Sequence, residues 1–127
     1  MVVSHTPCAT LDREWNEHGL APYVMCLCGQ ERGSKREQIR RVSEGKYKPG
    51  RILMIGDSPG DLAAADANRA LFFPVVPGHE AESWKELADS GLANFFAGGF
   101  AGEYQKKVLD GFQNAFLCDP LKNRETI

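Results

Sequence analysis

The sequence has no long apolar run and little excess of charge of either sign. No stretch approaches the roughly 18 apolar residues that a membrane-spanning helix needs, so we expect no membrane partner. Fifteen Lys and Arg residues against 17 Asp and Glu give a formal net charge of -2, which does not favour nucleic acid as a partner. The first residues also lack the basic start and apolar stretch of a signal peptide, and we therefore expect a cytoplasmic protein.

Cysteine is scarce, and its spacing does not match a zinc finger. The four cysteines lie in apolar surroundings, at Cys8, Cys26, Cys28 and Cys118. In a reducing compartment we expect them to stay free and to act as ordinary buried residues. Cys26 and Cys28 would share one face of a strand, and such a C-x-C pair can bind a soft metal, but no second pair at zinc-ligand spacing accompanies it.

Length and composition predict one globular domain over residues 1–127. The chain is long enough for a real core and too short for two ordinary domains. Apolar residues make up 43% and charged residues 25%, which excludes disordered and fibrous classes.

The apolar periodicity alternates between strand and helix along the chain. We expect a strand at Val2-Val3, then a helix capped by Thr6 with Pro7 at its first position and ended by Gly19. Further strands are expected at 23–27, 52–55 and 71–76, and further helices after Ser34, after Ser58, at 80–90 and at 103–116. This order favours an α/β fold with a doubly wound, mostly parallel sheet and helices on both faces.

The stretch 51–66, RILMIGDSPGDLAAAD, carries the most informative pattern. Its apolar run is typical of a strand buried on both faces, and Asp57 follows at the carboxyl end, where open α/β sheets place ligands. Asp61 comes four residues later, after the cap Ser58 and Pro59. Two carboxylates at one turn repel each other unless a hard cation such as Mg²⁺ lies near them. Asp61 has an alternative role as the partner of Ser58 in a capping box.

Two other polar residues stand at similar positions. Ser4 ends the first strand in front of a helix N-terminus, which is a ready anion site, although serine at a strand end is common. Lys35 lies in the first turn of the helix capped by Ser34, where the helix dipole disfavours a cation, so a nearby anion would explain it. The alternative is that Lys35 belongs to a solvated basic face with Arg36, Arg40 and Arg41.

Ser4 in VVSHTP, Lys35 in SKREQI and the turn GDSPGD, in this order, resemble the second, third and fourth motifs of the haloacid dehalogenase-like (HAD) hydrolases, a family mainly of Mg²⁺-dependent phosphatases. The resemblance covers about residues 2–78, and 79–127 look like a helical C-terminal extension. It implies a Rossmann-like sheet. It also implies that Ser4, His5, Thr6 and Lys35 bind the phosphate of a small phosphorylated substrate, with Ser4 and Lys35 in catalytic roles. Asp57 would hold Mg²⁺ and Asp61 would support the metal shell.

The first motif of that family, Asp-x-Asp, occurs nowhere in the sequence. Its first aspartate is the covalent nucleophile, so this chain has none and is expected to be an inactive C-terminal portion of such an enzyme. Asp119 is the nearest imitation, but it comes last instead of first. The strand that carries the motif is an inner one, and its loss would expose sheet edges through which the chain could form a homo-oligomer.

Two other functions compete with this interpretation. One is a non-catalytic α/β module that binds phosphate, a metal or a protein partner. The other is a phospho-receiver-like domain, but its acidic pair should come early and its lysine late, whereas Lys35 precedes Asp57.

Overall fold

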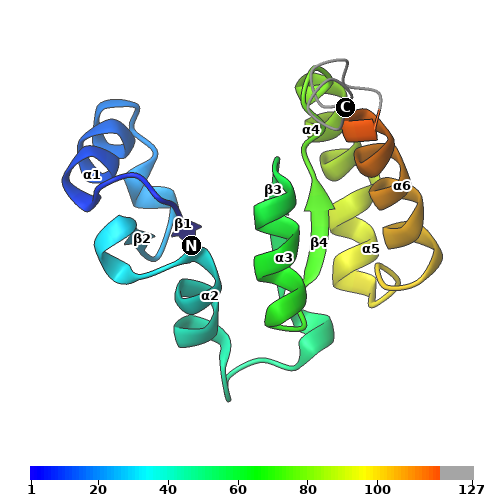
Figure 1. The fold of residues 1–127 in the computed structure, drawn as a ribbon, viewed down its shortest axis with the longest axis horizontal. Helices are drawn as coiled ribbons and strands as arrows, with labels where there is room; N and C mark the ends of the chain where they lie inside the picture. The colour runs from blue at the N-terminus through cyan, green and yellow to red at the C-terminus, as the bar shows by residue number, and fades with distance from the viewer. Residues whose placement is uncertain (118–127) are drawn as a thin grey trace, which may run out of the picture. The chain divides into compact units, whose positions relative to one another are not determined.

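The computed structural model describes residues 1–117, and these residues form two compact units. The N-terminal unit is Met1–Tyr47 and the C-terminal unit begins at Lys48. Each has its own two-stranded parallel sheet with helices, so the chain is an α/β protein, as expected (Figure 1). Among the described residues no helix is long and apolar enough to cross a membrane. The single domain expected over 1–127 stays a prediction.

The N-terminal unit pairs two very short strands and packs two α-helices beside them. Its elements in chain order are β1 (Val2–Val3), α1 (Cys8–Glu17), a 3₁₀ turn (Ala21–Tyr23), β2 (Leu27–Cys28), a 3₁₀ turn (Gln30–Arg32) and α2 (Lys35–Ser43). In the parallel register, Val2 lies opposite Leu27 and Val3 opposite Cys28. The strand at Val2-Val3 and the helix after Ser34 are confirmed, and the Ser34 hydroxyl accepts a bond from the Glu37 amide as its cap.

Two expectations for this unit were wrong. The strand expected at 23–27 is a 3₁₀ turn followed by an irregular segment, and only Leu27 of that range is a strand residue. Tyr23 and Met25 there are 85% and 96% exposed, so no core holds their alternating side chains in place. Helix α1 starts at Cys8 with Pro7 at the N-cap position, and no side chain of that residue or of Thr6 caps it.

Up to Leu117, the C-terminal unit contains a longer parallel pair and four α-helices. Its elements are a 3₁₀ turn (Pro49–Arg51), β3 (Leu53–Gly56), α3 (Pro59–Ala67), β4 (Leu71–Pro74), α4 (Glu80–Glu86), a π-helical segment (Leu87–Gly91), α5 (Leu92–Ala97) and α6 (Glu103–Leu117). The helix expected at 80–90 in fact continues to Ala97 through the π-helical segment. The absence of a side chain at Gly91 lets the helix pack tightly here, because a Cβ would lie only 3.0 Å from the Leu87 side chain and 3.1 Å from that of Phe73.

The core of this unit lies on both faces of β4. Successive side chains of a strand point to opposite faces, and Phe72 and Phe73 accordingly join two different clusters. Phe72 packs with Ala65 of α3 and with Phe112 of α6, while Phe73 packs with Leu87 and Phe100. Ala64 and Ala65 of α3 are buried. The lack of bulk there allows α3 to lie close to the sheet.

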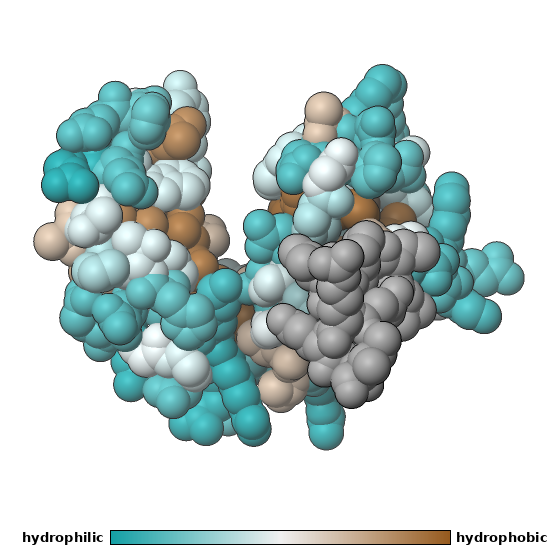
Figure 2. Space-filling model, turned by 45° about the horizontal axis from the view of Figure 1, so that its top comes forward, coloured by the Kyte–Doolittle hydropathy of each residue, from teal (hydrophilic) through white to brown (hydrophobic). Residues whose placement is uncertain are grey.

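Strand β3 is less buried than its apolar sequence predicts. Leu53 and Met54 are half-buried and Ile55 is 36% exposed, because β3 pairs only with β4 among the described residues of this sheet. The outer edge of β4 is partly protected, since the Phe72 amide donates to Gln105 Oε1 of α6 at 2.9 Å. Figure 2 shows hydrophilic residues over much of the visible surface, with apolar residues reaching it between them.

Candidate functional site

Ser4 lies at the carboxyl end of β1, where the sequence placed it, and its polar atoms are engaged locally. Its amide donates to Cys28 O at 2.9 Å and to Gln38 Oε1 at 3.2 Å. Its hydroxyl accepts a bond from the Thr6 amide at 3.0 Å, which shapes the loop before α1. His5, between them, is exposed. The loop is thus built around Ser4, and no functional role is needed to explain its ordered backbone.

Gln38 of α2 organises this corner of the N-terminal unit. Its side chain is almost completely buried, with 1% of the residue exposed. Besides accepting from the Ser4 amide, it donates through Nε2 to the carbonyls of Ser4 (3.2 Å), Gly29 (2.9 Å) and Gly33 (3.0 Å). A buried amide satisfied at both ends joins the end of β1, the end of β2 and the start of α2. Sequence reasoning missed it, because a glutamine on a polar helix gives no sign of burial.

Lys35 is brought to the same corner by the helix. It is the first residue of α2 and is half-buried. Residues three apart on a helix share a face, so Lys35 lies on the side of α2 from which Gln38 reaches Ser4. Arg36, Arg40 and Arg41 are exposed, so the basic face is solvated, whereas Lys35 is partly withdrawn from it.

The N-terminus of α1, expected to be an anion site, already binds a carboxylate of the chain. The Cys8 amide donates to both carboxylate oxygens of Glu31, with its nitrogen 2.8 Å from Oε2 and 3.2 Å from Oε1. Hydrogen bonds from the Cys8 side chain and amide lower the pKa of Glu31. Gly29 lies against the same turn, because a Cβ there would be 2.6 Å from Thr6 O and 2.7 Å from the Cys8 amide nitrogen. In this structure Glu31 is therefore the anion that α1 meets.

In the C-terminal unit, the turn after β3 holds both predicted aspartates. Asp61 is 3% exposed, and its Oδ2 accepts bonds from the amides of Asp57 (3.1 Å) and Ser58 (3.3 Å). In return the Asp61 amide donates to the Ser58 hydroxyl at 3.2 Å, which completes the capping box at the start of α3. Asp61 thus fixes the backbone of Asp57, and the capping role considered for it is confirmed.

Gly56 makes this arrangement possible. A Cβ at this position would lie 2.6 Å from both Cβ and Oδ2 of Asp61, closer than real atoms approach. The buried carboxylate therefore packs directly on the backbone at the end of β3. The sequence marked Gly56 only as the residue that ends the strand, and the steric reason appears with the tertiary structure.

Asp57 is the residue that this turn presents to its surroundings. It is exposed, and no ion pair holds its carboxylate among the residues described. A carboxylate oxygen is the ligand type that Mg²⁺ prefers, so Asp57 fits the role of a metal ligand and Asp61 that of its support. Within residues 1–117 no three His, Cys, Asp or Glu side chains come close enough together to hold a metal ion. The six predicted site residues are divided between the two units, with Ser4, His5, Thr6 and Lys35 in the first and Asp57 and Asp61 in the second.

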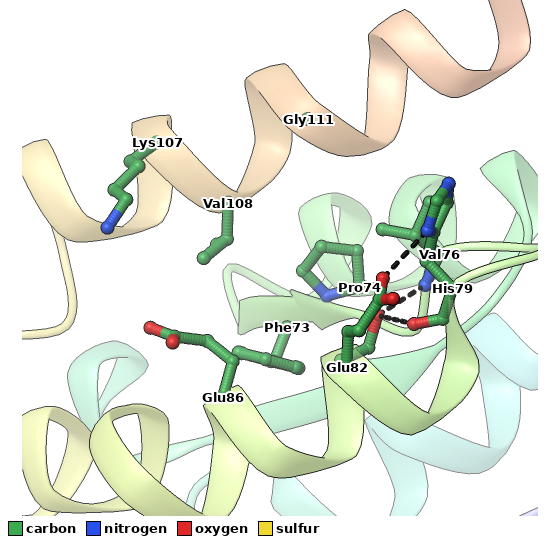
Figure 3. Close-up of a pocket in the computed structure, with 10 residues that line it drawn as sticks. Phe73, Pro74, Val76, His79, Glu82, Glu86, Lys107, Val108 and Gly111 are labelled. Atoms are coloured by element: carbon green, nitrogen blue, oxygen red, sulfur yellow. Dashed lines mark hydrogen bonds and ion pairs between the residues drawn. The ribbon is translucent and has the colours of Figure 1, made fainter.

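A separate cavity of about 350 Å³ opens at the carboxyl end of β4 (Figure 3). Phe73, Pro74 and Val108 give it an apolar floor, and charged side chains from α4 and α6, among them Glu82 and Lys107, stand around it. Sequence reasoning missed this cavity, because its walls come from elements that only the fold brings together.

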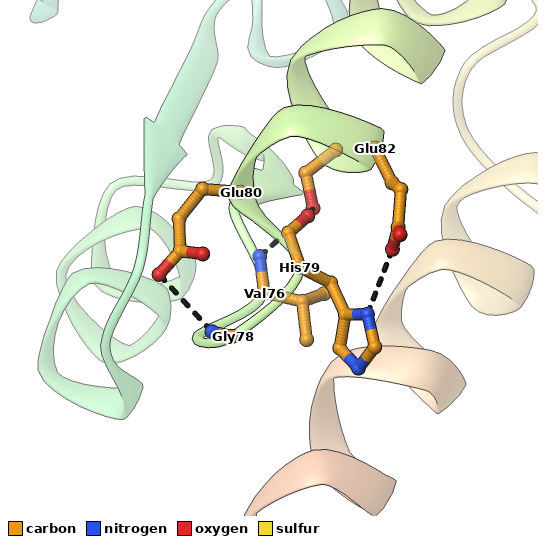
Figure 4. Close-up of polar contacts among 6 residues, drawn as sticks. Val76, Gly78, His79, Glu80 and Glu82 are labelled. Carbon is orange, nitrogen blue, oxygen red and sulfur yellow. Dashed lines mark hydrogen bonds and ion pairs between the residues drawn. The ribbon is translucent and has the colours of Figure 1, made fainter.

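Hydrogen bonds hold the turn before α4 beside this cavity (Figure 4). The Ser83 hydroxyl accepts from the Val76 amide at 3.0 Å and donates to the His79 carbonyl at 2.9 Å. His79 Nδ1 lies 2.7 Å from Glu82 Oε2, and Glu80 accepts from the Gly78 amide at 3.0 Å. This hydrogen bond from the Gly78 amide is the main cause that lowers the pKa of Glu80.

The chain has no match among the known proteins compared with it, whether as a protein family, as a curated sequence or as a solved structure. The candidate site therefore rests on its residues and their geometry.

Proposed function

We propose that this chain is a portion of a Mg²⁺-dependent HAD-like phosphohydrolase and that it is inactive by itself. The observation that carries the proposal is the turn after β3. There an exposed carboxylate, Asp57, follows a parallel strand and is held in place by the buried Asp61. Such a turn presents one hard oxygen ligand at the edge of the sheet where α/β enzymes bind ligands.

The N-terminal unit supports the phosphate half of the proposal. Ser4 follows β1 and Lys35 begins α2, and Gln38 of α2 bonds to the backbone of Ser4 and to that of Gly33, two residues before Lys35. A hydroxyl and an ammonium are suited to the equatorial oxygens of a phosphoryl group, and His5 and Thr6 belong to the same loop. Mg²⁺, when bound by Asp57, would supply positive charge toward such a group. We further propose that the fold class is a Rossmann-like, doubly wound, mostly parallel sheet that lacks an inner strand.

Turnover and metal binding test this proposal separately. The chain has no Asp-x-Asp, so we expect no release of phosphate from monoesters above background, whereas a longer parent protein with that motif should be active. Weak Mg²⁺ binding, of millimolar affinity or poorer by order of magnitude, is expected from so few carboxylates. It should disappear in Asp57→Asn and persist in Asp66→Asn, which alters an exposed aspartate on α3. Equal binding by both variants, or turnover by the chain alone, would contradict the proposal.

A non-catalytic binding module is the second candidate, and the cavity beside β4 favours it. An apolar floor with charged groups around it is typical of small-molecule sites, and its volume falls in their usual range. An apolar anionic dye should gain fluorescence on binding there. Val108→Phe, which fills the cavity, should abolish the gain, and Lys106→Phe, at an exposed position, should not. Dye binding that is unchanged by Val108→Phe would remove this candidate.

A further inference from the structure

Cys26 comes directly before β2 and Cys28 is its last residue, in the N-terminal unit. Both carbonyls face β1, since Cys26 O accepts from the Val2 amide at 3.1 Å and Cys28 O from the Ser4 amide at 2.9 Å. Side chains two apart in an extended segment share a face, so the two thiols point to the same side. Both residues are free and half-buried, which leaves them accessible to small reagents.

The Cys28 thiol also lies close enough to Cys26 to be influenced by it electrostatically. Burial, and after it the neighbouring Cys26, raise the pKa of the Cys28 thiol above its ordinary value. The thiolate is the reactive form of cysteine, so Cys28 is mostly protonated at neutral pH, and its reaction becomes faster as the pH rises.

We propose that Cys26 and Cys28 form a reversible disulfide and are a modification site for low-molecular-weight disulfides. One thiolate attacks a sulfur of the reagent RSSR, which forms a mixed disulfide and releases RS⁻. The other thiolate then attacks the protein sulfur of that mixed disulfide and releases the second RS⁻. The protein loses two electrons and two protons, and the reagent is reduced to two RSH.

The bond would be strained, which makes it easy to reduce and gives it an effect on Ser4. Residues two apart in a strand have Cα atoms about 6.6 to 6.8 Å apart, at the upper limit of about 6.8 Å for a disulfide. Closing the bond must therefore pull the segment out of its extended form. The carbonyls that move are those that hold the amides of Val2 and Ser4, so oxidation weakens the β1–β2 pairing and frees the Ser4 backbone.

Trypsin separates this pair from the other cysteines. Cleavage after Arg13 and Arg32 gives a peptide 14–32 that contains Cys26 and Cys28 and excludes Cys8 and Cys118. The chain is equilibrated with oxidised and reduced glutathione in a series of ratios, and its remaining thiols are alkylated. It is then digested with trypsin, and the masses of the peptides are measured by mass spectrometry. With excess oxidised glutathione we expect peptide 14–32 two hydrogens lighter and without alkylation, and with excess reduced glutathione we expect it doubly alkylated.

Variants and alternative products decide the outcome. Cys8→Ser should leave the disulfide unchanged, which excludes the nearby Cys8 as the partner. Cys26→Ser should abolish the bond and leave Cys28 alkylated or bound to one glutathione. In the oxidised chain, hydrogen exchange at the Val2 and Ser4 amides should be faster than in the reduced chain. Full alkylation at every ratio, stable mixed disulfides only, or a link to the peptide of Cys8 would each overturn the proposal.

Discussion

Replacing Gln38 by methionine should selectively destabilise the N-terminal unit. Methionine has a similar length but neither donates nor accepts, so the carbonyls of Ser4, Gly29 and Gly33 lose a donor. An unsatisfied buried carbonyl costs about 1 to 3 kcal/mol, and the bonds to Ser4 and Gly33 are only partly buried. We therefore expect the free energy of unfolding to fall by about 2 to 4 kcal/mol.

Tryptophan fluorescence can report this change for one unit at a time. Trp15 lies in α1 of the N-terminal unit, and Trp84 in α4 is 52% exposed, so Trp84→Phe removes the second signal at little cost. Urea unfolding is followed in that background for Gln38→Met and for the control Gln113→Met, an exposed position on α6. A loss below about 1 kcal/mol, or one equal to that of the control, would refute the role of Gln38.

Gln38→Glu adds a pH dependence of known sign. Burial among carbonyl oxygens should raise the pKa of the introduced carboxyl, because the charged form is disfavoured there. The protonated form can donate one hydrogen bond, so the variant should be closest to the parent in acid and should lose stability as pH rises through its folded pKa. A constant difference between variant and parent across that range would contradict the expected burial.

Three further predictions follow from other parts of the structure. In a thermal melt, Gly56→Ala should lower the free energy of unfolding by about 1 to 3 kcal/mol, because the new Cβ collides with Asp61. The control Gly60→Ala should be neutral or stabilising, because a Cβ there lies 3.7 Å from its nearest neighbour. Equal effects of the two variants would refute the steric argument. Burial, and then Glu86, raise the pKa of Tyr104 from 10.0 to about 12. Absorbance of the phenolate should therefore show one late-titrating tyrosine, with a lower value in Glu86→Gln and stability that falls as pH rises between these values. Among the described residues β1 and β3 each pair along one edge only, which predicts association, so the sedimentation coefficient should rise with protein concentration. A monomer whose melting temperature does not vary with concentration would contradict this.

The local elements were the most predictable part of this protein. Ser58, Pro59 and the apolar run before Asp57 encode a strand, a turn and a helix within a few residues, and the structure has all three. The capping box could also be predicted, because Ser58 and Asp61 are only three residues apart in the sequence. The strand expected at 23–27 failed because β propensity alone cannot hold a strand, and Tyr23 and Met25 find no partner surface.

The sequence by itself determined the α/β class, the helices capped by Ser34 and Ser58 and the place of Asp57 after a strand, because these depend on neighbours along the chain. Only the tertiary structure decided which polar groups are buried and which residues meet. Gln38 bonds to the backbone of Ser4 and Gly29, and Glu31 accepts a hydrogen bond at the N-terminus of α1, because folding brings β1, β2 and α2 together. Close approach of backbone and side chain likewise explains Gly56, since the collision with Asp61 exists only once α3 has packed on β3.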